Sequence, residues 1–201
     1  MGKIVILMGA SGSGKDTIYT KLIEENPYEL QNITPCTTRP IRDGEMEGKE
    51  YYFKTLEQMQ KMQQQNQIVE LRTYQTIYGP WHYFTGAQNI DLQSYHYITI
   101  NTLVGYDQFV SYYGEENILP ILLQMDDGIR LQRALDREKI QQNPKYAEMC
   151  RRFLADATDF SLENIQKRKI EPQNMIDNSG LIEETLKKVN KVLENNLKSL
   201  K

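Results

Sequence analysis

The chain reads Gly9-Ala10-Ser11-Gly12-Ser13-Gly14-Lys15-Asp16-Thr17 between an apolar run, residues 4–8, and a segment with the pattern of a helix, residues 18–23. A strand, a glycine-rich loop and a helix in this order are the context of a phosphate-binding loop. The glycines let successive backbone N–H groups turn toward an anion, and the helix N-terminus adds partial positive charge. Lys15 follows the last glycine, where its ammonium group can reach the outer phosphates. We therefore expect residues 9–17 to bind the phosphates of a nucleotide.

Composition limits the class of protein. At 201 residues the chain is long enough for one domain, or for one core with inserted subdomains. A hydrophobic content of 39% with 25% charged residues is typical of a soluble globular protein. A net charge of −3 gives no general attraction to nucleic acid or to an anionic membrane. We expect neither as a partner, and we expect a monomer or a homodimer.

The expected location is the cytoplasm. No apolar run approaches the roughly 20 residues of a membrane span, and residues 3–8 are too short for a secretory core. Cys36 and Cys150 are far apart and do not make a disulfide framework, so we expect free thiols.

Strand and helix patterns alternate along the chain. Apolar or alternating runs predict strands at 3–8, 28–34, 51–53, 67–75, 81–85, 95–101, 118–125 and 174–177. Helical patterns cover 15–26, 55–65, 102–113, a long region from 126 that is broken near 143–144, and 181–197. Tyr78-Gly79-Pro80 has the composition of a hairpin turn. The order predicts an α/β fold in which a parallel core sheet is flanked by helices, with ligands bound beyond the carboxyl ends of the strands.

A second polar segment, residues 37–53, contains two arginines three residues apart, Arg39 and Arg42, on a loop stiffened by Pro40. Guanidinium groups donate paired hydrogen bonds to phosphate oxygens, and a fixed backbone keeps them aimed. Tyr51 can add a hydroxyl donor. The segment therefore predicts a second phosphate site, separate from the glycine-rich loop.

With these two segments in place, the chain resembles the guanylate kinase family. The resemblance is carried by the glycine-rich loop, by residues 37–53, and by Ile68-Val69-Glu70 after them. It implies the P-loop nucleoside monophosphate kinase fold. The implied parts are a core (1–33, 93–126 and 161–201), an inserted NMP-binding region (34–92) and a mobile lid (127–160).

The resemblance also implies an activity, which is transfer of the terminal phosphate of ATP to GMP, giving GDP and ADP, with Mg²⁺. Arg39, Arg42 and Tyr51 would hold the phosphate of GMP. Glu70 would read the guanine edge, since a carboxylate accepts hydrogen bonds from N1 and the exocyclic amino group, a pair of donors that adenine lacks. The family often has a base-contacting serine where this chain has Pro35, and Thr37 or its neighbours Cys36 and Thr38 could replace it.

The lid is expected to supply further cations. Arg133 and Arg137 are four residues apart and share a helix face, and Arg152 follows after a longer segment than the family usually has. The resemblance implies that these arginines close over the phosphates and, with Lys15, stabilise the transferring group. We expect Arg130 and Arg151 to be surface residues.

Two departures from the family pattern concern the metal and the base. The acidic residue that the family carries at the end of the third core strand aligns with Thr99 or Asn101, while Asp16 stands where a hydroxyl residue usually follows the loop lysine. We therefore hypothesise that Asp16 has taken over the organisation of Mg²⁺. After Glu70, either Tyr78-Gly79 or the pair Tyr83 and Thr85 can match the family's GMP-binding tyrosine and hydroxyl residue. We favour the second register.

Two other functions stay open. One is a kinase of the same fold that acts on another nucleoside monophosphate or on a phosphorylated sugar such as ribose bisphosphate. A Lys-Asp pair in the loop is also found in kinases of that kind. The other is a non-catalytic interaction module, against which Lys15 and the lid arginines argue. A Glu70→Gln variant would test the guanine assignment, and a measurement of ATP binding would test for the module.

Overall fold

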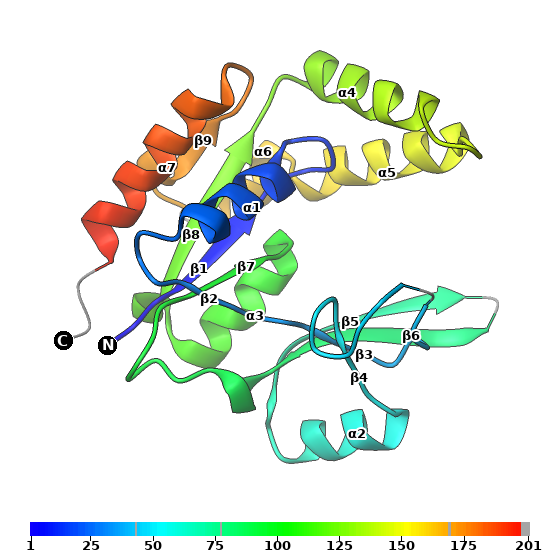
Figure 1. The fold of residues 1–201 in the computed structure, drawn as a ribbon, viewed down its shortest axis with the longest axis vertical. Helices are drawn as coiled ribbons and strands as arrows, with labels where there is room; N and C mark the ends of the chain where they lie inside the picture. The colour runs from blue at the N-terminus through cyan, green and yellow to red at the C-terminus, as the bar shows by residue number, and fades with distance from the viewer. Residues whose placement is uncertain (43, 77, 169, 198–201) are drawn as a thin grey trace.

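A computed structural model of the chain describes residues 1–42, 44–76, 78–168 and 170–197. Its core is a five-stranded parallel sheet with the strand order β2-β7-β1-β8-β9. The strands are β1 (Ile4–Met8), β2 (Gln31–Asn32), β7 (Tyr97–Ile100), β8 (Ile118–Gln124) and β9 (Met175–Asp177). The parallel core sheet expected from the sequence is confirmed (Figure 1).

Helices cover both faces of this sheet. Every residue of β1 is fully buried, as expected for a central strand. Val5 and Leu7 point to one face, where α1 (Lys15–Glu25) and α7 (Ile182–Asn196) pack. Ile4 and Ile6 point to the other, where α3 (Leu103–Tyr113) and the short α6 (Leu162–Gln166) pack. The alternation of neighbouring side chains therefore supplies two apolar layers from one strand.

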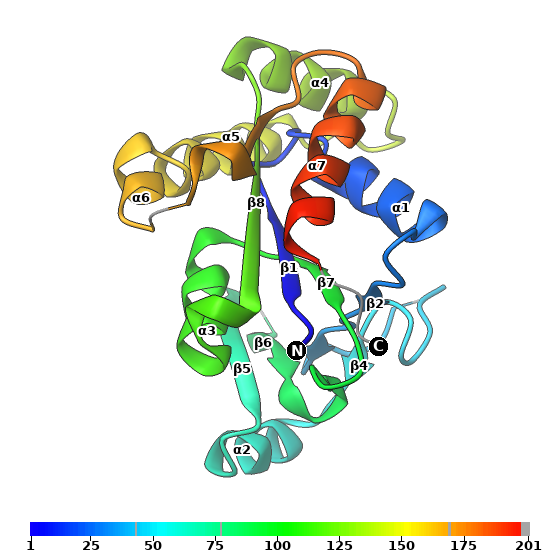
Figure 2. The same cartoon turned by 90° about the vertical axis from the view of Figure 1, so that its left-hand side faces the viewer.

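A second sheet projects from the core and has the order β4-β3-β6-β5. Its strands are β3 (Cys36–Thr37), β4 (Tyr52–Phe53), β5 (Ile68–Thr76) and β6 (Gly79–Gly86). Helix α2 (Leu56–Gln64), capped by Thr55, covers one face of it by packing Met59 and Met62 against Phe84. Figure 2 shows this sheet on one side of the core and helices α4 and α5 on the other.

The lid segment consists of two packed helices, α4 (Asp127–Lys139) and α5 (Tyr146–Asp159). The interruption between them contains the expected break at residues 143–144. Short 3₁₀ turns occupy Ala87–Asn89, Glu115–Asn117 and Pro172–Asn174. Within the described residues no helix has the length and apolar character needed to cross a membrane. The exact boundaries between core, inserted region and lid stay predictions.

The hairpin turn lies slightly earlier than its composition suggested. Thr76 pairs with Gly79, so strand β6 already begins at Gly79 instead of following Pro80. The hydroxyl of Thr76 donates to the Gly79 carbonyl at 2.7 Å, and it accepts from the Tyr78 amide at 3.1 Å. Gly79 has a φ of 97°, a conformation that favours glycine. The expected strand at 28–34 is also shorter, because only Gln31 and Asn32 pair with β7.

Candidate active site

The glycine-rich loop runs from the end of β1 to the start of α1, at the carboxyl end of the parallel strands. Gly12 and Gly14 have φ values of 85° and 83°, and Gly14 is the N-cap of α1. A Cβ atom on Gly14 would lie 2.4 Å from Nδ2 of Asn178, so a larger residue does not fit. Because the N-cap residue is a glycine, it has no side chain that could cap this helix. Its first N–H groups and its partial positive charge therefore suit an anion.

Buried polar residues from the end of the chain hold this loop in place. The side-chain amide of Asn178 donates to the Ser13 carbonyl at 2.7 Å. The Asn178 side-chain carbonyl accepts from the hydroxyl of Thr185 at 2.7 Å. Both residues are almost fully buried, which excludes water that would compete for these bonds. The loop is thus supported by the segment between β9 and α7.

The lid helices also contact the loop. The Ser11 amide donates to the Asp156 carboxylate at 2.6 Å, and Nη1 of Arg130 donates to the Ser11 carbonyl at 3.4 Å. Arg130 also pairs with Asp127 at 2.9 Å and stacks on Phe153, 3.9 Å from the ring centroid. The expectation that Arg130 is a surface residue is therefore wrong. It is 3% exposed because these three neighbours enclose it.

Lys15 and Asp16 begin helix α1 at the mouth of the site. Nζ of Lys15 lies 3.3 Å from Oδ2 of Asp16, and 78% of the Asp16 side chain is exposed. No group of three His, Cys, Asp or Glu residues that could hold a metal ion occurs in the described parts of the chain. Mg²⁺ in nucleotide sites needs only one or two carboxylates, because phosphate oxygens and water complete its shell. Asp16 fits that requirement.

The polar residues that replace the family's strand acid do not open into the site. Thr99 and Asn101 are 7% and 5% exposed. The Asn101 side-chain carbonyl accepts from the Thr102 amide at 2.9 Å, next to the start of α3. Asp16, in contrast, is an exposed acid, and it lines one cavity together with Ile100 at the end of β7.

That cavity joins the core to the inserted sheet. It has a volume of about 480 Å³. The residues that line it are Asp16, Pro35, Tyr51, Arg72, Tyr74, Trp81, Tyr83 and Ile100. Residues next to the phosphate loop and residues of the inserted sheet therefore border the same space.

Three cross-strand pairs form the face of the inserted sheet that borders this cavity. Glu70 on β5 is opposite Thr85 on β6, Arg72 is opposite Tyr83, and Tyr74 is opposite Trp81. Residues two apart on a strand point to the same side. Thr85 donates to Oε1 of Glu70 at 3.1 Å. In contrast, Tyr78 is 79% exposed at the hairpin tip. This geometry agrees with the register in which Tyr83 and Thr85 follow Glu70, although their roles stay predictions.

Arg39 lies deep in the inserted region and is already paired. Its guanidinium donates two hydrogen bonds to Glu45, at 3.0 and 2.7 Å, and it faces the Tyr51 ring at 5.5 Å. The bond with Glu45 raises the pKa of Arg39, and the same bond lowers the pKa of the Glu45 carboxyl. Nε of Arg39 is buried without a hydrogen-bond partner in the described chain. A buried guanidinium with an unused donor suits an anion such as a phosphate.

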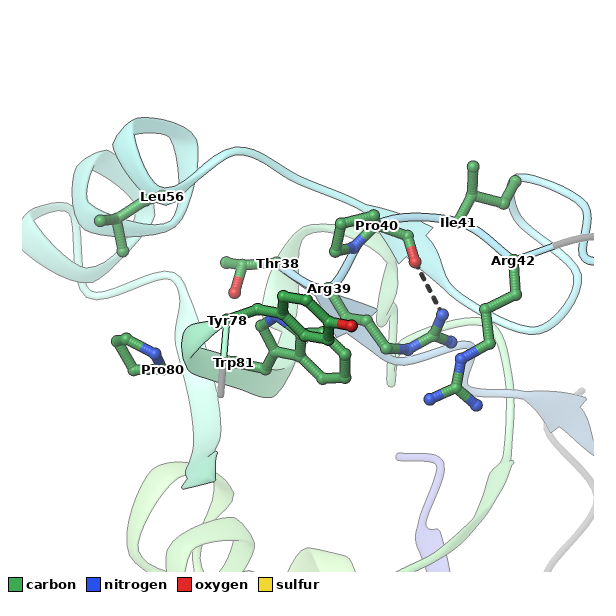
Figure 3. A pocket seen from close by; sticks show the side chains of 9 residues that line it. All are labelled: Thr38, Arg39, Pro40, Ile41, Arg42, Leu56, Tyr78, Pro80 and Trp81. Atoms are coloured by element: carbon green, nitrogen blue, oxygen red, sulfur yellow. Dashed lines mark hydrogen bonds between the residues drawn. The ribbon is translucent and has the colours of Figure 1, made fainter. Parts of the chain in front are cut away.

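Tyr51 contacts this arginine, and Arg42 borders a cavity together with it. The ring centroids of Tyr51 and Tyr83 are 5.6 Å apart. Arg42 is exposed, and it borders a second cavity of about 550 Å³ beside the stacked rings of Tyr78 and Trp81. Figure 3 shows the side chains of Arg39 and Arg42 on the same side of this stack. Asp43, between Arg42 and Glu45, lies outside the described residues.

Not every expected site residue reaches the cavity. Thr37 is fully buried, and its hydroxyl donates to the His82 carbonyl at 2.9 Å and accepts from the Arg39 amide at 3.1 Å. The structure therefore places Thr37 within the sheet, where it fixes the backbone of Arg39. Thr17 is exposed on the first turn of α1.

The lid arginines are exposed and lie at different distances from the loop. Nη1 of Arg133 is 4.0 Å from the position that a Cβ of Gly14 would take. Arg137 is exposed one turn further along α4. Arg152 on α5 approaches Glu148 at 3.8 Å. Among the three, Arg133 is the one whose guanidinium the structure brings to the phosphate loop.

Four residues near the site were missed by sequence reasoning. Arg72 stands two positions after Glu70 on one strand, so the alternation of side chains could have placed it on the same face. No sequence pattern indicated a role for Glu45, Asp156 or Asn178. Each of them contacts its hydrogen-bond partner only because the folded backbone brings the two together.

Comparisons with known proteins bear on this arrangement. Residues 1–84 match the model of the Guanylate kinase family. A guanylate kinase from Mycoplasmoides gallisepticum is 39% identical over 77 residues, which is 38% of this chain and 40% of that protein. A guanylate kinase from Lactobacillus delbrueckii subsp. bulgaricus is 35% identical over 79 residues, 39% of each chain. Protein lin-2 from Caenorhabditis elegans is 41% identical over 78 residues, 38% of this chain and 8% of that protein.

A solved structure extends the likeness to the whole fold. The crystal structure of guanylate kinase from Anaplasma phagocytophilum superposes with a TM-score of 0.64 at 20% identity, over 99% of this chain and 88% of that one. The matched segments span about 40% of the length of the two curated guanylate kinases. The resemblance to the guanylate kinase family and the α/β fold expected from the sequence are confirmed.

Proposed function

We propose that this chain is a kinase that transfers the terminal phosphate of ATP to GMP, giving ADP and GDP. One observation carries the proposal. A single cavity is bordered by Asp16, next to the phosphate-loop lysine, and by Tyr51 and Tyr83 of the inserted sheet. Donor and acceptor phosphates bound at these two places would face each other. The guanylate kinases among the relatives support GMP as the acceptor.

The chemistry of phosphoryl transfer needs positioning and charge stabilisation more than covalent help from the protein. In the proposal, the amides of residues 12–16 and the ammonium of Lys15 hold the phosphates of ATP. Arg39, Arg42 and Tyr51 hold the phosphate of GMP. Asp16 would hold Mg²⁺, which when bound would neutralise part of the phosphate charge.

The lid completes this scheme. Arg133 already lies beside Gly14, and closure of α4 and α5 would bring Arg137 and Arg152 toward the transferring group. A closed lid excludes water and so limits hydrolysis of ATP. We further propose a cytoplasmic enzyme, a monomer or a homodimer, without nucleic-acid or membrane partners. The net charge of −3 supports the absence of such partners.

A coupled ADP-release assay over a panel of nucleoside monophosphates and ribose phosphates, with and without Mg²⁺, tests the proposal. We expect Mg²⁺-dependent ADP release with GMP, and a kcat/KM for AMP, UMP or dCMP that is lower by about a hundredfold or more. A better rate with another acceptor would show a kinase of the same fold with a different substrate. The absence of both ATP binding and turnover would show a non-catalytic interaction module.

A further inference from the structure

Arg130 lies where the phosphate loop meets the base of the lid. Helix α4 buries one face, which carries Arg130, Ala134 and Glu138 at helical spacing. A Cβ atom on Gly12 would lie 3.1 Å from Cγ of Arg130, so this side chain packs directly against the loop backbone. Nη1 of Arg130 also donates to the Ser11 carbonyl at 3.4 Å. The first turn of α4 is therefore attached to the loop through a buried cation.

Asp156 completes this contact from α5, the other lid helix. Its Oδ2 atom accepts from the Ser11 amide at 2.6 Å and lies 3.9 Å from Nη1 of Arg130. Asp127 binds the same guanidinium at 2.9 Å, and the Phe153 ring packs over it. Figure 1 shows both lid helices next to the loop between β1 and α1. The two helices and the loop thus meet at one buried cation, where water competes little for the contacts.

Arg133 stands three residues after Arg130 on α4, next to the buried face of the helix. Its Nη1 atom lies 4.0 Å from the position that a Cβ of Gly14 would take, at the N-terminus of α1. Within the described residues, however, the Arg133 guanidinium forms no hydrogen bond or ion pair. Its place beside the loop therefore depends on the position of the helix that carries it.

We propose that Arg130 and Asp156 are positioning residues, which hold Arg133 beside the phosphate loop so that its guanidinium meets the transferring phosphate. This inference rests on the proposed function. A cation stabilises developing charge best when it is fixed in place before the reaction. A misplacement of about 1 Å can lower a rate about a hundredfold. Release of α4 from the loop should therefore slow phosphoryl transfer, although neither positioning residue contacts a substrate in this scheme.

A double-mutant cycle between Arg130 and Arg133 tests the proposal. Arg130→Met removes the cation but keeps an unbranched side chain that can cover Phe153. We expect kcat to fall about thirtyfold, because Arg133 is misplaced. The KM for the acceptor should change by less than about twofold, because the inserted sheet lies on the other side of the core (Figure 2).

The second arm of the cycle removes the residue that is being positioned. Arg133→Met alone should lower kcat about a hundredfold. In the Arg133→Met background, Arg130→Met should lower kcat by less than about twofold more, because no guanidinium is left to position. A residue that only supports the fold would have the same effect in both backgrounds.

Asp156→Asn tests the same role from α5. The side-chain carbonyl of asparagine can still accept from the Ser11 amide, but the negative charge facing Arg130 is lost. We expect kcat to fall about fivefold with an unchanged KM, and circular dichroism to show a folded chain. In the Arg133→Met background this fall should disappear. This variant therefore tests the proposal even if Arg130→Met does not fold.

Arg151→Met is the matched control. Arg151 is an exposed arginine on α5 and pairs with Glu148 at 2.7 Å. Its replacement should leave kcat unchanged, both alone and together with Arg133→Met.

The outcomes distinguish this inference from the proposed function. If the effects of Arg130→Met and Arg133→Met on kcat multiply, or if Arg130→Met leaves kcat unchanged, the inference is wrong and the proposed function stands. If the wild-type chain prefers an acceptor other than GMP, the proposed function is wrong, and the cycle with that acceptor still tests the role of Arg130. If the wild-type chain transfers phosphate to no acceptor, both are wrong.

Discussion

The phosphate loop and the inserted sheet are suited to anions in two different ways. The loop is nine consecutive residues whose donors are backbone amides and one lysine, with its supporting residues Asn178 and Asp156 behind it. The residues of the inserted region that we expect to bind the acceptor, Arg39, Tyr51, Glu70, Arg72 and Tyr83, are called the acceptor face. They come from separate strands and loops, and Arg39 is already paired with Glu45 and Arg72 with Glu70. The donors of the loop can bind an anion directly. At the acceptor face, a ligand must either compete with the carboxylates of Glu45 and Glu70 for the arginines or bind while these pairs stay intact.

Specificity for the acceptor is expected to reside in the paired charges and not in the loop. Backbone amides bind any phosphate of suitable shape and carry no information about the acceptor. A buried charged pair needs both of its members, because removal of either one leaves the other charge uncompensated. Changes in the loop should therefore affect the rate with every acceptor, while changes in the paired residues should affect which acceptor is used.

The largest expected effect is at Lys15. Lys15→Met should lower kcat by about 10³-fold with GMP and with every other acceptor, because one fixed cation at the phosphates is lost. The free energy of unfolding should change by less than about 0.5 kcal/mol, because the carboxylate partner of Lys15, Asp16, is 78% exposed. Steady-state kinetics and denaturant unfolding measure the two quantities. Lys191→Met on the exposed side of α7 is the control, and a loss confined to GMP would contradict the account.

The contact between lid and loop should contribute to stability. Asp156→Ala leaves the Ser11 amide without its carboxylate acceptor and removes the second carboxylate beside Arg130, which keeps Asp127. We expect a loss of about 2 kcal/mol in the free energy of unfolding. Asp159→Ala removes an exposed carboxylate at the end of the same helix and should cost less than about 0.5 kcal/mol. Equal effects of the two variants in urea unfolding would show that the contact with Ser11 is not formed in solution.

The metal hypothesis predicts a moderate effect at Asp16. Asp16→Ser restores the usual hydroxyl residue but removes the exposed carboxylate. We expect the Mg²⁺ concentration for half-maximal activity to rise by about tenfold, because one negatively charged ligand is lost. A Mg²⁺ titration of the initial rate at fixed ATP measures it. An unchanged Mg²⁺ requirement would mean that Asp16 does not organise the metal.

The smallest expected effect is a pH dependence at the acceptor face. Hydrogen bonding to Arg39 lowers the pKa of Glu45 from its model-peptide value of 4.5. The ionised Glu45 carboxylate therefore contributes fully to the free energy of unfolding above about pH 4.5. This contribution is lost as the pH falls through the lowered pKa of Glu45 in the folded state. Glu45→Gln should unfold with a shallower dependence on pH in this acidic window. Glu24→Gln, which removes an exposed carboxylate, is the control, and equal slopes for both variants would contradict the pairing.

Much of the fold could be predicted from local patterns. Three features depend only on residues close together in the sequence. They are the apolar run that forms β1, the capping threonine before α2 and the break between α4 and α5. Strand β2 was predicted too long, because pairing with β7 stops after Asn32. The order of the second sheet could not be predicted, since it depends on contacts between segments far apart in the chain.

The part of the site that is continuous in the sequence was predictable. The parts that the fold brings together from separate segments were not. The loop from Gly9 to Thr17 was read directly from its spacing. Arg130 was misjudged because a charged residue on a helix is usually solvated, whereas here Phe153 and Asp156 enclose it. The pairing of Arg39 with Glu45 is not revealed by a residue pattern, whereas the alternation of side chains along β5 could have placed Arg72 beside Glu70.

The central claim is that the phosphate loop and the acceptor face are two halves of one site. Titration calorimetry with a compound in which adenosine and guanosine are joined through five phosphates tests it most directly. We expect one molecule bound per chain, with a Kd at least about a hundredfold below the Kd of ATP or of GMP alone, because both halves are engaged at once. A Kd no lower than that of ATP would contradict it.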